Sequence, residues 1–222
     1  MIRLDFIAVL AAWRPFMAGT LMTILLTAAI LVVSTPAGLA LAVARDSRWG
    51  IVRLCVAVAS GVCRGVPPLL LLLIVFFVPA QFGLNLSSFL SAVIGMSTYM
   101  SFYFAEVFRG GLASVGRGQY QAADSLGLGP VRTFRRIIFP QILPTVIPSY
   151  VSHASSLLKE TALASAVAVQ ELTGVAKGLF SVTYRPIETL LVVGVIYAAL
   201  STVMFGLQFM FERRLAGRGR KV

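Results

Sequence analysis

Charged residues are scarce in this sequence of 222 residues. They make up 12% of the chain, whereas hydrophobic residues make up 58%, and the mean hydropathy is +0.90. A soluble domain carries about 25% charged residues, so this chain has too few to cover a water-exposed surface. The same figures exclude intrinsic disorder, because disordered chains are poor in apolar residues. An ordinary soluble enzyme is therefore excluded.

Residues that bind metals or carry out covalent catalysis are also rare. Cys55 and Cys63 lie eight residues apart in a hydrophobic stretch with no His or carboxylate at ligand spacing, which indicates small apolar residues. The sequence contains no phosphate-binding G-x-x-x-x-G-K-[ST] loop, no H-E-x-x-H and no G-x-S-x-G. We therefore predict no catalytic residue, no metal site and no ATP site of its own.

The chain contains long hydrophobic runs without charged residues. Four stretches lack Asp, Glu, Lys and Arg, and the longest is divided by polar residues at 81–88. A spanning helix needs about 20 apolar residues, whereas barrel strands would alternate polar and apolar residues. We predict an all-α membrane protein, with one domain over residues 1–222 and five transmembrane helices near 16–44, 52–80, 88–108, 144–166 and 187–211.

The distribution of positive charge predicts the orientation. The net charge is +11, and 13 of the 19 Lys and Arg residues follow the first, third or fifth predicted span. Loops after the second and fourth spans hold few cations. The positive-inside rule then places the N-terminus outside and the C-terminus in the cytoplasm. The basic excess reflects this topology and does not indicate nucleic-acid binding.

The cytoplasmic segment 117–140 does more than connect two spans. Residues 119–126 favour a helix that Gly127 and Gly129 would end, and residues 131–138 favour a short basic amphipathic helix at the membrane surface. Two short helices at a sharp angle would transmit force from a soluble partner. An ordinary connecting loop is the alternative interpretation.

This segment resembles the EAA motif of ABC-importer permease subunits. The motif covers Gln121-Ala-Ala-Asp-Ser-Leu-Gly127 and Ile137-Ile-Phe-Pro140, with Gln121 in place of the usual Glu and Phe139 in place of the usual Leu. Further segments are similar to those of the polar amino-acid uptake permeases of the histidine/lysine-arginine/glutamine type, in the same order: RGVPPLL at 64–70, AEVFRGG at 105–111, LKETAL at 158–163 and ELT at 171–173.

The resemblance implies a type I ABC importer transmembrane fold in the cell inner membrane. It implies a permease that pairs with a second permease subunit, receives a polar amino acid from an extracytoplasmic solute-binding protein, and works with a separate ATPase dimer that binds ATP and magnesium. The residues that it implies for coupling to the ATPase are Gln119, Gln121, Ala122, Ala123, Gly127 and Pro140.

Polar residues inside the third and fourth spans are candidates for the passage. Ser149, Ser152, Ser156 and Glu160 form a stripe at helical spacing, and Tyr99, Tyr103 and Glu106 share one face of the third span. Ionisable residues within a membrane are costly and mark functional sites by default, although serines also permit close helix packing. The candidate substrate contacts are Glu106, Glu160, Tyr99, Tyr103, Ser156 and His153.

Several alternatives stay open at this point. The sequence does not distinguish arginine, histidine, glutamine or an opine as the substrate, nor a homodimer from a heterodimer. A passive channel or an ion-coupled carrier for polar amino acids is the alternative function, although the five spans contain no inverted repeat of the kind that common carriers use. The prolines within the spans, such as Pro36, mark either kinks or hinges.

Overall fold

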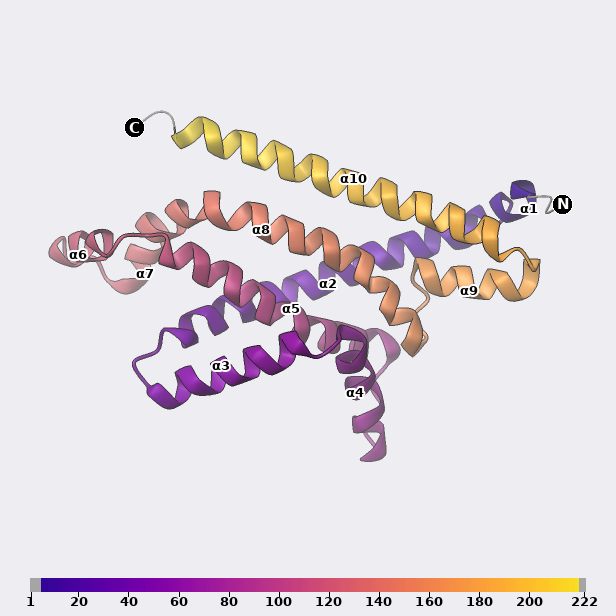
Figure 1. Cartoon of the computed structure of the whole chain (residues 1–222), viewed down its shortest axis with the longest axis horizontal. Helices are drawn as coiled ribbons and strands as arrows, with labels where there is room; N and C mark the ends of the chain where they lie inside the picture. Colours follow the sequence, from indigo (N-terminus) through magenta and orange to yellow (C-terminus); the bar gives the residue numbers. More distant parts are fainter. Residues whose placement is uncertain (1–4, 220–222) are drawn as a thin grey trace.

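The computed structural model describes residues 5–219, which form helices and connecting turns without any strand in that range. Four long helices run along the long axis of the molecule (Figure 1): α2 (Trp13–Arg45), α5 (Ser88–Ala113), α8 (Phe139–Glu160) and α10 (Pro186–Gly219). The all-helical prediction is confirmed for this part of the chain.

Two helices are long and apolar enough to cross a membrane by themselves, namely α2 and α10 over Pro186–Arg213. A third span results if the bent pair α3 (Gly50–Gly65) and α4 (Pro68–Gln81) is taken together. Helices α5 and α8 follow the same long axis but carry more polar side chains. The count of five spans stays a prediction.

The segment predicted as a single second span consists of two helices at 102° to each other. Val66 and Pro67 between them are extended, with ψ of 135° and 136°. A residue before proline is disfavoured in the α conformation, so Val66 leaves the helix, and Pro68 then begins α4 in its first turn. Figure 1 shows α4 turning away from the long axis.

Helix α5 is central because α2, α4 and α8 all pack against it. Glycines permit two of these approaches: a Cβ at Gly38 of α2 would lie 2.7 Å from the Phe104 Cβ, and one at Gly95 would lie 3.0 Å from the Leu72 Cα. Small residues at such positions let membrane helices approach closely. The side chains that α5 turns toward α8 are therefore held from two sides.

The segment 117–140, which we call the coupling segment after the role that the resemblance implies, forms a compact tip at one end of the molecule (Figure 1). It contains α6 (Arg117–Ser125), α7 (Pro130–Thr133) and a wide π-helical turn over Phe134–Ile138 that continues directly into α8. The predicted amphipathic helix over 131–138 is thus α7 plus this turn, with no break before α8. The end of α10 and the α2–α3 connection lie at the same end.

The opposite end is built from α1 (Phe6–Leu10), the start of α10 and a helix that the sequence did not predict, α9 (Leu172–Thr183). A 3₁₀ segment over Thr161–Val167 extends α8 and ends at Ala168, whose φ of 63° is left-handed. Helix α9 then lies where we expected a loop after the fourth span. Its buried residues Leu172 and Ala176 pack with Phe16 of α2 and Val193 of α10.

Candidate functional site

An aromatic cluster joins α5 to α8. The rings of Tyr99 and Tyr103, one turn apart on α5, have centroids 4.8 Å apart, and the His153 ring of α8 lies 5.4 Å from the Tyr103 ring. Three of the six predicted substrate contacts are therefore brought together, although the whole coupling segment separates them in the sequence. Aromatic rings at these distances present both apolar faces and polar edges to a neighbouring group.

Glu160 supplies the charge beside this cluster. It is the last residue of α8, its side chain is half-buried, and its Oε2 atom is buried without a hydrogen-bond partner among the described residues. Glu160 follows His153 by seven residues, or two turns, so the two side chains share one face of α8. An unpartnered buried carboxylate oxygen is costly, so an N–H group of a ligand would stabilise it.

The remaining polar stripe of α8 lies along open surface in the single chain. Ser156, one turn before Glu160, is half-buried, whereas Ser149 and Ser152 are exposed. Exposed hydroxyl groups on a helix of an apolar bundle are expected where water or a second polar surface covers them. The stripe therefore continues the polar lining from Glu160 along α8 toward the coupling segment.

Tyr150 also belongs to this region, and the sequence did not reveal it as a site residue. Its ring stacks on Phe104 with centroids 4.4 Å apart, and its hydroxyl lies 2.7 Å from the Thr35 Oγ1. It therefore ties α8 to both α5 and α2. Its three-residue spacing from His153 was the available signal, because residues at that spacing share a helix face.

Glu106 is engaged elsewhere. Its carboxylate accepts a hydrogen bond from Arg109 at 2.8 Å and pairs with Arg64 of α3 at 3.7 Å. Although Glu106 follows Tyr99 and Tyr103 along α5, its described partners are Arg109 of the same helix and Arg64 in the last turn of α3. The structure therefore joins Tyr99, Tyr103 and His153 in one cluster, while Glu106 joins α3 to α5.

The predicted coupling residues lie on and beside α6. Gln121 and Ala122 are exposed, whereas Ala123 is fully buried. Gly127 ends the helix with a φ of 66°, and the Leu128 N–H donates to the Ala123 carbonyl at 3.0 Å. This is a glycine C-terminus of the Schellman type, as the sequence predicts. Helix α6 therefore buries Ala123 against the rest of the protein and exposes Gln121 and Ala122.

The two remaining coupling candidates are Gln119 of α6 and Pro140 of α8. Gln119 accepts a hydrogen bond at 3.3 Å from the amide of Gln141, which lies in the first turns of α8, and the neighbouring Pro140 is exposed there. Leu126, at the end of α6, is 75% exposed. An apolar side chain presented so fully at the tip is suited to burial by a partner.

A buried carboxylate organises the opposite end. Glu171 is fully buried and caps α9 by accepting hydrogen bonds from the backbone N–H groups of Thr173 and Gly174 at 2.9 and 2.7 Å. It also accepts a hydrogen bond from the Tyr197 hydroxyl of α10 at 2.7 Å. The ELT segment at 171–173 is therefore a helix cap that anchors α9, and Tyr197 is its partner that sequence reasoning missed.

Comparison with known proteins identifies a family for this chain. Residues 34–217 match the family model described as "Binding-protein-dependent transport system inner membrane component". The chain is 33% identical to a probable amino-acid ABC transporter permease protein, y4tG, of Sinorhizobium fredii over 82% of this chain and 79% of that protein. It is 35% identical to the octopine transport system permease protein OccM of Rhizobium meliloti over 71% and 68% of the two chains.

Solved structures show the same arrangement. A chain from the crystal structure of an amino acid ABC transporter with histidines superposes with a TM-score of 0.87 at 31% identity, and the match covers 96% of this chain and all of that one. An inward-facing MetNI methionine ABC transporter gives a TM-score of 0.70 at 18% identity over 91% of this chain and 94% of that one, which supports the fold alone.

Proposed function

The chain belongs to the family of binding-protein-dependent transport system inner membrane components, and we propose that it is the transmembrane permease subunit of an ATP-driven importer for polar amino acids. The relatives are amino-acid ABC transporter permeases, and the structural neighbours are transmembrane subunits of ABC importers. The passive channel or ion-coupled carrier is therefore not favoured.

The observation that carries this proposal is the compact tip at the end of α5 and α8. Helix α6 follows α5 after a short turn, and the π-helical turn passes without interruption into α8. A push on α6 by an ATPase would therefore reach Tyr103 through α5 and His153 through α8. Rigid helices carry such a displacement, whereas a flexible loop would absorb it.

We further propose that Glu160 and the aromatic cluster contact the substrate. The carboxylate has an unpartnered oxygen for an ammonium or guanidinium group, and the half-buried Tyr103 ring, packed on the buried Tyr99, offers a face for a cation. Ser156 and His153 would hydrogen-bond its polar atoms. The exposed serines of α8 support a passage that a second permease subunit, identical or paralogous, completes.

The orientation follows from the same proposal. Arg45, Arg48 and Arg53 lie around the α2–α3 connection, at the same end of the molecule as α6. We place this end in the cytoplasm, because cytoplasmic segments carry the excess of cations. A separate ATPase dimer, holding ATP and magnesium, would meet the tip there, and an extracytoplasmic solute-binding protein would meet the α9 end of a multi-pass subunit in the inner membrane.

Reconstitution tests the function directly. The chain is co-expressed with its partner permease and ATPase, purified as a complex, and inserted into liposomes with the binding protein on one side and ATP on the other. We expect uptake of a polar amino acid that requires both ATP and the binding protein. The readout is radiolabelled uptake across a panel of basic, amide and acidic amino acids.

Two controls make the result decisive. A complex whose ATPase carries a substitution in its own phosphate-binding loop should bind the binding protein but import nothing. Uptake that continues without ATP, or that follows an ion gradient instead, would show a channel or carrier and contradict the proposal.

A further inference from the structure

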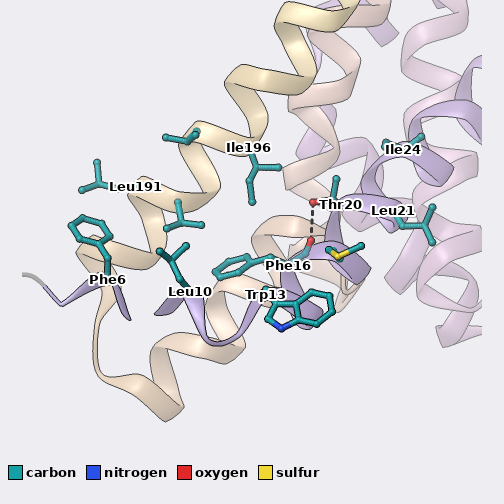
Figure 2. A pocket seen from close by; sticks show the side chains of 12 residues that line it. Phe6, Leu10, Trp13, Phe16, Thr20, Leu21, Ile24, Leu191 and Ile196 are labelled. Carbon is teal, nitrogen blue, oxygen red and sulfur yellow. Dashed lines mark hydrogen bonds between the residues drawn. The ribbon is translucent and has the colours of Figure 1, made fainter. Parts of the chain in front are cut away.

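An apolar groove separates the first helices of the chain from α10. It has a volume of about 830 Å³ and is lined by α1, the first turns of α2 and the first turns of α10. Figure 2 shows Phe6 and Leu10 of α1 on one side and Leu191 and Ile196 of α10 on the other, with Phe16 of α2 beside Leu10. Phe16 is 4% exposed and forms the floor of the groove.

The walls of the groove are open to the surroundings of the protein. Met17 of α2 and Val195 of α10 are 63% and 69% exposed, and Trp13 projects at the rim. The hydroxyl of Thr20, which also lines the groove, donates to the Phe16 carbonyl of its own helix at 2.7 Å, drawn as a dashed line in Figure 2. This hydroxyl therefore needs no ligand, and the lining suits hydrocarbon.

A positive charge lies at the rim. The guanidinium carbon of Arg14 is 5.4 Å from the centre of the Trp13 ring, in a cation–π contact. No carboxylate among the described residues lies within salt-bridge distance of Arg14. Arg185, near the start of α10 at the same end, is instead paired with Asp5 at 3.0 Å and with Glu188 at 3.6 Å. Arg14, beside Trp13 at the rim of the groove, is therefore able to pair with an external anion.

We propose that the groove is a phospholipid site that takes one acyl chain between α2 and α10 and pairs the lipid phosphate with Arg14. Trp and Arg are typical of the membrane–water interface, so Trp13 and Arg14 would lie at headgroup depth while the groove extends into the hydrocarbon. The inference uses the membrane location of the family but no step of amino-acid transport.

Charge complementarity decides between occupants. Acyl chains are as apolar as the lining, so entering the groove gives little hydrophobic gain over remaining in the bilayer. Selectivity must then come from the headgroup at Arg14, and one basic residue near an anionic surface contributes about 1 kcal/mol, or roughly a fivefold preference. The site should therefore retain phosphatidylglycerol over phosphatidylcholine of the same chain length. Such a lipid would hold α10 against the start of α2.

Native mass spectrometry of the purified transporter complex tests the site. Complexes are delipidated, incubated with phosphatidylglycerol or phosphatidylcholine of matched chains, and scored for lipid retained per permease chain. We expect Arg14→Gln to remove about a fivefold preference for phosphatidylglycerol, and Val195→Trp, which fills the groove, to abolish retention of both lipids there. The matched controls on α3 are Arg53→Gln and Ile51→Trp, at two exposed positions far from the groove.

A second readout does not depend on the filled groove folding normally. The sequence contains two tryptophans, Trp13 and Trp49. The complexes are placed in nanodiscs with phosphatidylglycerol that is brominated along its acyl chains, and quenching of tryptophan fluorescence is measured. The Trp49→Phe complex should show quenching from Trp13, and this quenching should disappear when Trp13 is also replaced by Phe. In the Trp49→Phe background, Arg14→Gln should reduce the quenching.

Three results would overturn the proposal. Equal retention of the two lipids by the unaltered complex would remove the role of Arg14. Retention unaffected by Val195→Trp, in a complex that still assembles with its ATPase, would place the lipid elsewhere. Disulfide crosslinking between two Leu191→Cys chains would show that a second copy, not a lipid, covers the groove.

Discussion

The Tyr197 hydroxyl donates a hydrogen bond of 2.7 Å to the fully buried carboxylate of Glu171, which joins α10 to the first turn of α9. The same carboxylate caps α9, so one side chain fixes both the start of a short helix and its distance from a long one. This arrangement explains why a 12-residue helix is stable at the end of the bundle.

Removing the hydroxyl tests this role. Tyr197→Phe should lower the free energy of unfolding by about 1–3 kcal/mol, because the buried carboxylate then lacks one of its donors. Thermal unfolding of the detergent-solubilised complex measures the change. Tyr184→Phe is the control, since Tyr184 is 86% exposed, and equal effects of the two substitutions would contradict the role of the hydrogen bond.

Glu160 carries the charge of the proposed substrate site. Glu160→Gln should reduce uptake of a cationic or zwitterionic amino acid roughly 10- to 100-fold, because a hydrogen bond to a charged group is lost. ATPase assembly should be unchanged. Uptake kinetics in proteoliposomes provide the measurement, with Lys159→Gln as the control one residue earlier, and full uptake by Glu160→Gln would exclude the carboxylate from substrate binding.

Binding of the ATPase should be sensitive to a charge at Leu126, the exposed apolar residue at the end of α6. Leu126→Asp should weaken copurification of the ATPase at least about tenfold, because a charged group would have to be desolvated at the interface. Ser125→Asp, at the neighbouring exposed position of α6, controls for the added charge. If the ATPase copurifies normally with Leu126→Asp, the partner does not bury this part of the tip.

The close approach of α2 and α5 depends on the absence of a side chain at Gly38. Gly38→Ala would place a methyl group 2.7 Å from the Phe104 Cβ, so we expect a loss of about 1–3 kcal/mol in stability. Gly194 is the matched glycine inside α10, where an added Cβ meets nothing within 4 Å. Gly194→Ala should be neutral or stabilising by up to about 1 kcal/mol, and thermal unfolding distinguishes the two.

Most of the helical architecture could be predicted from uncharged runs, because the hydrocarbon of a bilayer excludes both charge and unpaired backbone groups. Local rules also placed the end of α6 at Gly127. The bend at Pro67 was visible as a proline pair, but its angle of 102° depends on how α4 packs on α5. Helix α9 escaped prediction because a 12-residue helix is shorter than a membrane span.

The site was predictable only in part, because helical spacing assigns faces within one helix and not contacts between helices. The spacing placed Tyr99 and Tyr103 together but could not show that His153 lies beside them. It also grouped Glu106 with these tyrosines, whereas two arginines engage it. Tyr150 and Tyr197 escaped notice, since their partners Thr35 and Glu171 are distant in sequence or on another helix.

The wide turn at Phe134–Ile138 has a consequence for how this region tolerates change in length. A π turn contains one residue more than an α turn. Deleting a single residue there would let α7 and α8 join as regular helix, so every side chain beyond it, His153 included, would keep its angular phase. A single deletion within α8 itself would instead rotate everything after it by about 100°. The five-residue turn can therefore lose one residue without changing the orientation of the helices on either side.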